Sequence, residues 1–247
     1  MGKDILVENG EHKIPAYLSR PEGAIKGGLI VIEEIWGLTD HIKDICNRFS
    51  KEGYLVLSPN LLSDTNIESL VTPQTAEDLF NPETRNAIQP KLREIMAPIQ
   101  SPEFGQAAKQ KLAESYAYLN KLLGASSNIA VVGFCFGGTY SFQLAINEPR
   151  LKAALAFYGN SSYSSQEIQK INCPILAFYG EHDERLIDQL PKLKEEMTKL
   201  GKNFTPVIYE NCGHAFFNDT NRYAYNEEAA TDAWVKTLDF LKRSLAS

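Results

Sequence analysis

A cysteine between glycines is the part of this sequence with the clearest capacity for covalent chemistry. Residues 133–138 read Gly-Phe-Cys-Phe-Gly-Gly, which places Cys135 in a G-x-C-x-G spacing. That spacing is typical of a nucleophile on a tight strand-to-helix turn, where small flanking residues let the helix approach the strand. The helix N-terminus would favour a thiolate, and the Phe136 N–H would stabilise an oxyanion. The motif predicts Cys135 as a nucleophile; the alternative is a buried cysteine packed beside glycines.

A histidine and an acid that could activate this thiol follow it in the chain. His214 is the last of the four histidines and lies between the last strand-like run and the final helical pattern, so it is the predicted general base. Asp183 follows another strand-like run and would hold the imidazole in one tautomer. Glu181 and Glu184 remain rival acids. His182 is a rival base, although directly neighbouring side chains diverge and Asp183 could not easily orient it.

Composition and charge exclude several other classes of function. The formal net charge is −6, without a block of like charges, so nothing favours binding to nucleic acid or to an anionic membrane. The N-terminus is too polar for a signal peptide, and no apolar run approaches the roughly 18 residues that span a bilayer. We therefore expect a cytoplasmic protein with reduced thiols at Cys46, Cys135, Cys173 and Cys212. No second Cys/His cluster accompanies the Cys212 region, so no metal site is predicted.

Short apolar runs alternate with helical patterns along the chain. This alternation predicts an α/β fold, with a mostly parallel sheet covered by helices on both faces. Asn9-Gly10, between two strand-like segments, favours an antiparallel hairpin at the start. The predicted strands of the sheet cover residues 28–33, 54–58, 128–133, 151–158, 174–179 and 204–209.

The helical patterns between these runs have recognisable ends. Gly53 suits the C′ position of a helix over residues 38–49, and Gly124 ends the helix before residue 128. A helix between the last two strands has Leu193, Met197 and Leu200 on one face, with Pro191 expected in its first turn. The chain closes with a helix whose apolar stripe runs from residue 230 to 241.

One stretch is irregular. Six of the twelve prolines lie between Pro59 and Pro102, among short helical pieces at 72–80 and 83–96. We expect residues 1–247 to form one domain with an irregular insert at about 60–105. The insert is either a lid or substrate-facing segment, or a surface elaboration that only packs.

Four motifs together resemble the dienelactone hydrolase family of α/β-hydrolases, over nearly the whole chain. The motifs are Glu33-Glu34-Ile35-Trp36-Gly37, the hexapeptide 133–138, Gly-Glu-His-Asp at 180–183 and Gly-His-Ala-Phe at 213–216. The resemblance implies the α/β-hydrolase fold and the order nucleophile, acid, histidine. It also implies that Glu34 contacts the resting thiol and helps to deprotonate it when substrate binds. The Ile35 N–H would be the second oxyanion donor beside that of Phe136.

The resemblance also brings departures that concern the substrate. Family enzymes that act on dienelactone hold its carboxylate with arginines, and one of these lies four positions after the histidine, where this chain has Asn218. Arg85 and Arg93 are candidates for the other, and Arg222 is a further basic residue near the histidine loop. Ala215 stands where the family has serine. These changes leave the hydrolytic chemistry intact but argue against dienelactone as the preferred substrate.

The predicted function is hydrolysis of an ester or lactone through a covalent acyl-thioester on Cys135. Alternatives are thioester or other acyl hydrolysis on the same triad, or a non-catalytic ligand-binding role. No cofactor or metal is required, and the expected partner is a small-molecule substrate; the oligomeric state is not determined. Several aromatic side chains either line an apolar pocket or pack in the core: Trp36, Phe134, Phe136, Tyr158, Phe216 and Phe217.

Overall fold

A computed structural model describes residues 2–8, 13–81, 83–124 and 128–246. Its strands form one eight-stranded sheet in the order β1-β2-β4-β3-β5-β6-β7-β8. The strands are β1 (Lys3–Glu8), β2 (Lys13–Ser19), β3 (Gly27–Ile32), β4 (Tyr54–Pro59), β5 (Ile129–Phe134), β6 (Ala153–Phe157), β7 (Ile175–Gly180) and β8 (Phe204–Tyr209). β2 pairs antiparallel with β1 and β4, and β3 to β8 are parallel. The predicted fold class is confirmed, while the turn at Asn9-Gly10 lies outside the described residues.

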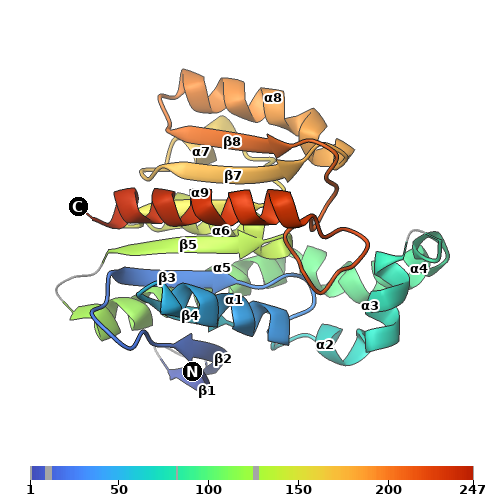
Figure 1. The fold of residues 1–247 in the computed structure, drawn as a ribbon, viewed down its shortest axis with the longest axis horizontal. Helices are drawn as coiled ribbons and strands as arrows, with labels where there is room; N and C mark the ends of the chain where they lie inside the picture. Colours follow the sequence, from blue (N-terminus) through green and yellow to red (C-terminus); the bar gives the residue numbers. More distant parts are fainter. Residues whose placement is uncertain (1, 9–12, 82, 125–127, 247) are drawn as a thin grey trace.

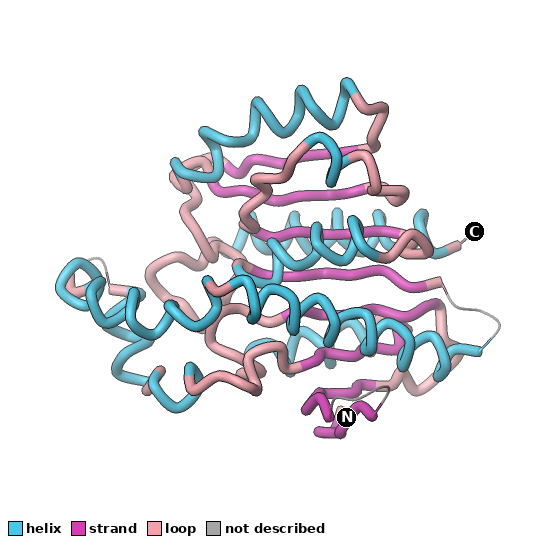
Figure 2. Tube along the Cα trace, turned by 180° about the vertical axis from the view of Figure 1, so that it is seen from behind, coloured by secondary structure: helices cyan, strands magenta, loops and turns pink. Residues whose placement is uncertain are grey.

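Helices cover both faces of this sheet (Figure 1). α1 (Asp40–Lys51) and α9 (Glu227–Leu245) lie on one face, and α5 (Pro102–Leu123) and α6 (Phe136–Asn147) lie on the other (Figure 2). α7 (Ser165–Ile168) and α8 (Glu184–Lys199) flank the β7–β8 end. The strands in the middle are buried on both faces, as their unbroken apolar sequences require. Gly53 follows α1 with φ 99°, as its predicted C′ position demands.

One helix start was predicted wrongly. The sequence places Pro191 in the first turn of the helix between the last two strands, but α8 begins at Glu184 and Pro191 lies inside it. Its buried stripe includes Leu190 and Leu186, which lie one and two turns before the apolar set used for the prediction. A proline costs a helix one hydrogen bond to the fourth preceding carbonyl, and this early apolar stripe packs well enough to outweigh that loss.

The insert forms short helices beyond the carboxyl ends of the strands (Figure 1). These are α2 (Ile67–Leu70), α3 (Pro73–Phe80), α4 (Arg85–Met96) and the 3₁₀ turn η1 (Ala97–Gln100). They enclose a small core of Leu62, Ile67 and Ile95, separate from the main core.

The root of the insert is tied to the sheet by buried polar contacts. The Leu61 N–H donates to Glu33 Oε1 at 2.7 Å. Lys111 Nζ, on a side chain only 3% exposed, donates to the Leu61 carbonyl at 3.2 Å and to Ser63 Oγ at 2.9 Å, and pairs with Asp64. Because a buried ammonium must be satisfied, these bonds fix where the insert leaves the sheet.

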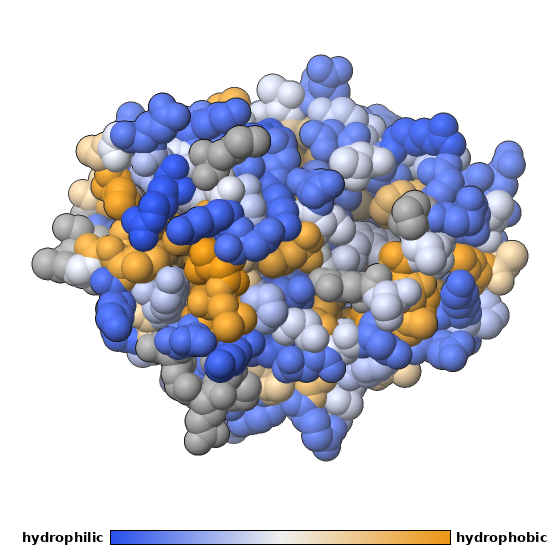
Figure 3. Space-filling model, turned by 90° about the horizontal axis from the view of Figure 1, so that it is seen from below, coloured by the Kyte–Doolittle hydropathy of each residue, from blue (hydrophilic) through white to orange (hydrophobic). Residues whose placement is uncertain are grey.

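The surface carries no uniform charged or apolar face in the view from the side of β1 and β2, where hydrophilic residues surround separate apolar patches (Figure 3). Among the described helices, none combines the length and apolar composition needed to cross a bilayer.

Candidate active site

Cys135 sits on a strained turn between β5 and α6. Its φ of 55° and ψ of −111° lie in a region that non-glycine residues avoid at a cost of about 1–3 kcal/mol. The Cys135 N–H donates to the Phe157 carbonyl at 3.0 Å and so fixes the turn to β6. A Cβ on Gly133 would lie 2.0 Å from the Gly137 carbonyl oxygen, and one on Gly137 would lie 2.2 Å from that of Ile32. The flanking glycines are therefore required by the close approach of α6 to the sheet.

His214 and Asp183 form the pair that the sequence predicts. His214 Nδ1 lies 2.5 Å from Asp183 Oδ2, and the Nδ1–H donates to this carboxyl oxygen, so Nε2 is the nitrogen that can exchange a proton with the thiol. The imidazole is surrounded by protein atoms, yet 41% of its side-chain surface opens to the cavity. Burial lowers the pKa of His214, but the nearby Cys135 sulfur and the hydrogen bonds that His214 makes with Asp183 and Cys135 outweigh burial and raise the pKa to about 10.

The rival acid and base point elsewhere. Glu181 Oε2 accepts a hydrogen bond from the Asn211 N–H at 3.0 Å and lies 3.8 Å from His182 Nε2. His182 lines the cavity, but its carboxylate neighbour is Glu181 rather than Asp183. The geometry therefore favours His214 with Asp183 over either alternative.

Glu34 lies beside this pair, buried to 2% exposure. Its Oε2 accepts from Asn218 Nδ2 at 2.8 Å, and its Oε1 accepts a long hydrogen bond of 3.4 Å from the Tyr158 hydroxyl. Burial raises the pKa of Glu34, and the charges of His41 and His214 and these two hydrogen bonds offset the rise only in part. The carboxyl therefore holds a proton more readily than an exposed glutamate does, which suits a group that exchanges a proton with a thiol.

Sequence reasoning missed His41 and Asp219 near Glu34, and it named Tyr158 only as an aromatic of the pocket or core. Tyr158, with φ 40°, follows β6 and holds Glu34. His41 is buried in the first turn of α1, and its Nδ1 lies 3.1 Å from Asp219 Oδ1. Asn218 therefore bonds Glu34, and the next residue, Asp219, bonds His41. Tyr158 could have been found from its place at the carboxyl end of a central strand, where parallel sheets form their sites.

We expect Glu34→Gln to stabilise the fold at neutral pH. A carboxyl whose pKa is raised on folding binds its proton more tightly in the native state, so stability falls as pH rises above the ordinary glutamate pKa. Glutamine keeps an acceptor for Asn218 and has no charge to bury, and the gain should be about 1–3 kcal/mol. Urea unfolding of both proteins at pH 5 and pH 8 measures it. The exposed Glu181→Gln serves as the control, and a gain that does not grow between these pH values would contradict the assignment.

A cavity of about 620 Å³ opens over Cys135 and His214. Glu34, Ile35 and Trp36 form its inner wall, and Arg85 reaches it from α4. The other lining residues come from the insert, from the loop after β7 and from the segment between β8 and α9: Leu79, Phe80, Asn86, Gln89, Leu92, His182, Asn211, Gly213, Ala215, Asn221, Tyr223, Ala224, Tyr225 and Asn226.

Other predicted binding residues lie outside this lining. Arg93 is exposed, and Asn218 is buried behind Glu34, donating to it. Of the aromatic set, Trp36 lines the cavity and packs edge-on against Phe80, with ring centroids 5.6 Å apart. The others pack in the main core or against it: Phe134, Phe136, Tyr158, Phe216 and Phe217.

The arrangement is suited to acyl transfer. Glu34, Cys135, Tyr158, Asp183 and His214 follow β3, β5, β6, β7 and β8 respectively, so the parallel sheet brings all five side chains to one edge. N–H groups in the first turn of α6 have no partner within the helix and can receive an oxyanion. Across the described ranges, no group of three or more His, Cys, Asp or Glu side chains is placed to hold a metal ion.

Comparison with known proteins agrees with this geometry. The sequence model of the "Dienelactone hydrolase family" matches residues 14–245. A relative from Saccharolobus solfataricus named "Putative carboxymethylenebutenolidase" is 36% identical, over 98% of this chain and 99% of the relative. A protein of the same name from Escherichia coli K12 is 29% identical, over 93% of this chain and 82% of the relative. The crystal structure of "Putative Dienelactone Hydrolase" from Klebsiella pneumoniae superposes with a TM-score of 0.80 at 25% identity, covering 98% of each chain.

Proposed function

Because this chain belongs to the dienelactone hydrolase family, we propose that it hydrolyses an ester or lactone bond of a small molecule, with Cys135 as nucleophile. One observation carries the proposal. The strained turn that bears Cys135 meets the His214–Asp183 pair at the floor of a cavity of about 620 Å³. The names of the relatives, carboxymethylenebutenolidase, support a carboxylic ester hydrolase acting on lactones.

The first half-reaction forms an acyl-thioester. His214 Nε2 holds the proton that comes from the thiol, and the Cys135 sulfur attacks the carbonyl carbon. The carbonyl oxygen becomes an oxyanion, which the N–H groups of Ile35 and Phe136 stabilise. When the C–O bond breaks, the leaving alkoxide takes the proton from the imidazolium. In a lactone this alcohol stays attached to the acyl group.

The second half-reaction releases the acid. His214 removes a proton from water, the hydroxide attacks the thioester carbonyl, and the thiolate leaves and recovers a proton. Asp183 keeps the imidazole in the productive tautomer through both steps. Glu34, with its raised pKa, helps to pass the proton of the resting thiol to His214 when substrate binds, a role that follows from the family resemblance.

A fluorogenic short-chain ester tests this proposal directly. Hydrolysis should be abolished by prior alkylation of Cys135, and a slowly hydrolysed ester should leave an acyl group on Cys135 that mass mapping locates. Turnover that survives complete alkylation of Cys135 would refute the mechanism. Thioester hydrolysis on the same triad would appear as a higher kcat/KM for the matched thioester than for the oxygen ester.

Arg85 is the proposed anchor for an anionic substrate group. The sequence lacks a charge at Asn218, and that side chain is turned to Glu34, but Arg85 brings a guanidinium to the cavity from α4. We expect Arg85→Met to lower kcat/KM for a carboxylated lactone roughly tenfold to more than a hundredfold, as for the loss of a charge-assisted hydrogen bond. Neutral esters of similar size should be unaffected.

Arg93→Met is the matched control, because Arg93 lies on the same helix but outside the cavity lining. Steady-state kinetics on a carboxylated lactone and a neutral ester, for both variants, decides the assignment. Equal losses on both substrates for Arg85→Met, or a selective loss for Arg93→Met, would show that the anion is held elsewhere.

A further inference from the structure

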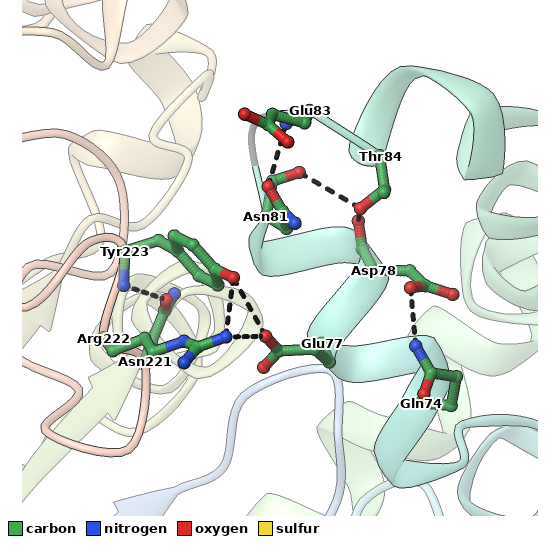
Figure 4. Close-up of polar contacts among 9 residues, drawn as sticks. All are labelled: Gln74, Glu77, Asp78, Asn81, Glu83, Thr84, Asn221, Arg222 and Tyr223. Carbon is green, nitrogen blue, oxygen red and sulfur yellow. Dashed lines mark hydrogen bonds and ion pairs between the residues drawn. The ribbon is translucent and has the colours of Figure 1, made fainter.

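The insert is fastened to the loop after His214 by a polar cluster (Figure 4). Glu77 Oε1, on α3, accepts hydrogen bonds from the Arg222 guanidinium at 2.5 Å and from the Tyr223 hydroxyl at 2.9 Å. The same guanidinium donates to the Tyr223 hydroxyl at 2.8 Å and lies over its ring, 4.8 Å from the centroid. The Tyr223 and Arg222 hydrogen bonds hold the pKa of Glu77 below its usual range, so the carboxylate is ionised at neutral pH. These three residues are called the clamp below.

Residues on both sides of the clamp line the cavity. Leu79 and Phe80 follow Glu77 directly on α3 and line the cavity, and Tyr223 lines it from the opposite side. Phe80 also packs on Trp36, which follows the proposed oxyanion donor Ile35. The distance between insert and loop at the clamp therefore sets the width of the space above Cys135.

The two attachments of the insert differ in burial. The root is held by Lys111, whose side chain is 3% exposed, whereas Glu77 and Arg222 in the clamp are 43% and 72% exposed. Exposed ion pairs stabilise weakly and are screened by salt, while a buried, fully bonded ammonium does not separate without a large penalty. The clamp is therefore the weaker of these two attachments and the root is the stronger.

We infer that Glu77, Arg222 and Tyr223 are specificity-determining positioning residues, which restrict the substrate to compact esters and lactones by holding the insert against the histidine loop. This inference rests on the proposed hydrolytic function of the same site. A bulky ester, such as one with a fused two-ring aromatic acyl group, enters efficiently only after the clamp opens.

Glu77→Gln tests the inference, because it removes the charge and keeps the shape. The kcat/KM ratio of 4-nitrophenyl 2-naphthoate to 4-nitrophenyl acetate should rise roughly three- to tenfold, the range expected for loss of an exposed ion pair. Glu83→Gln is the matched control: Glu83 is an exposed acid of the same insert, and in Figure 4 it lies apart from Arg222 and Tyr223, with a dashed line to Asn81 instead. Its ratio should equal that of the wild type. A purely structural role would lower the thermal midpoint and both rates together, without moving the ratio.

Salt supplies a second readout. Raising ionic strength from about 0.05 to about 1 M shortens the Debye length several-fold. The kcat/KM ratio of naphthoate to acetate should therefore rise in the wild type towards the value for Glu77→Gln. The ratio for Glu77→Gln itself should not change with salt. A salt response of equal size in Glu77→Gln would overturn the inference.

Thiol alkylation separates this inference from the proposed function, since it needs no turnover. The rate of Cys135 labelling by a pyrenyl maleimide, divided by the rate for iodoacetamide, should rise in Glu77→Gln and stay unchanged in Glu83→Gln. If no ester is hydrolysed but this labelling ratio rises, the proposed function fails and the clamp stands. If esters are hydrolysed and neither ratio moves in Glu77→Gln, the clamp is refuted and the function stands.

Discussion

Cys135→Ala is expected to lower kcat for ester hydrolysis by about 10⁵–10⁶-fold, the order seen when a covalent nucleophile is removed from a triad enzyme. The acyl-thioester cannot form without the sulfur, and the oxyanion donors alone leave only weak residual catalysis. Alanine at a φ of 55° keeps the same backbone restriction as cysteine, so the elbow should remain folded. Steady-state assays with a fluorogenic ester, and circular dichroism of the variant, measure both effects.

Cys173→Ala is the control for this loss. Cys46 and Cys173 are buried, and burial raises the pKa of both thiols, that of Cys173 to about 12, so neither supplies a thiolate at neutral pH. The Cys173 variant should keep wild-type kcat/KM. Full activity in Cys135→Ala would remove the basis of the proposed mechanism, whatever the behaviour of the other thiols.

Asp183→Asn is expected to lower kcat by about 10⁴-fold. The asparagine amide can donate to Nδ1, which turns the imidazole to the tautomer whose Nε2 carries the proton and cannot accept one from the thiol. Asp183 also helps to raise the pKa of His214, so its replacement should lower that pKa. An imidazolium exists only below its pKa, so His214 should lose its second proton at a lower pH in the variant.

The pH dependence of Cys135 alkylation by iodoacetamide measures this second effect. In the wild type, His214 keeps both ring protons to high pH because its pKa is about 10. In Asp183→Asn the upper limb of the profile should move to lower pH. Glu181→Gln, which alters a neighbouring acid that bonds the Asn211 N–H instead of His214, should leave both kcat and the profile unchanged. A profile that does not move in Asp183→Asn would argue that another group orients His214.

The fold class was predictable from local patterns. Apolar runs in the centre of the sheet are buried on both faces and so read as continuous hydrophobic segments, and β5 and β7 were predicted within one residue of their bounds. The start of α8 was not predicted correctly. Pro191 suggested the first turn of the helix, whereas α8 begins at Glu184 and packs Leu186 into the core. A proline inside a helix costs about 3 kcal/mol, and the burial of a whole apolar stripe stabilises the helix by more than that.

The candidates for the triad also followed from the sequence, and the reason is topological. A nucleophile turn and acid and histidine loops that follow parallel strands must meet at the carboxyl edge of the sheet, so order along the chain implies proximity. The sequence could not choose among Asp183, Glu181 and Glu184, since all three lie within four residues. The side-chain geometry favours Asp183 through its 2.5 Å contact with His214.

What the sequence by itself determined was the chemistry available: a cysteine on a glycine-flanked turn, a late histidine and an acid before it, to which the family resemblance added Glu34. What only the tertiary structure decided was the surroundings of these groups. The burial of Glu34 between Asn218 and Tyr158, the choice of Arg85 over Arg93 for the cavity, and the meeting of Glu77 with Arg222 all join residues more than a hundred positions apart or depend on which face of a helix is turned inward. Such contacts have no signature in local periodicity, because they are set by where the insert leaves the sheet and how it packs there.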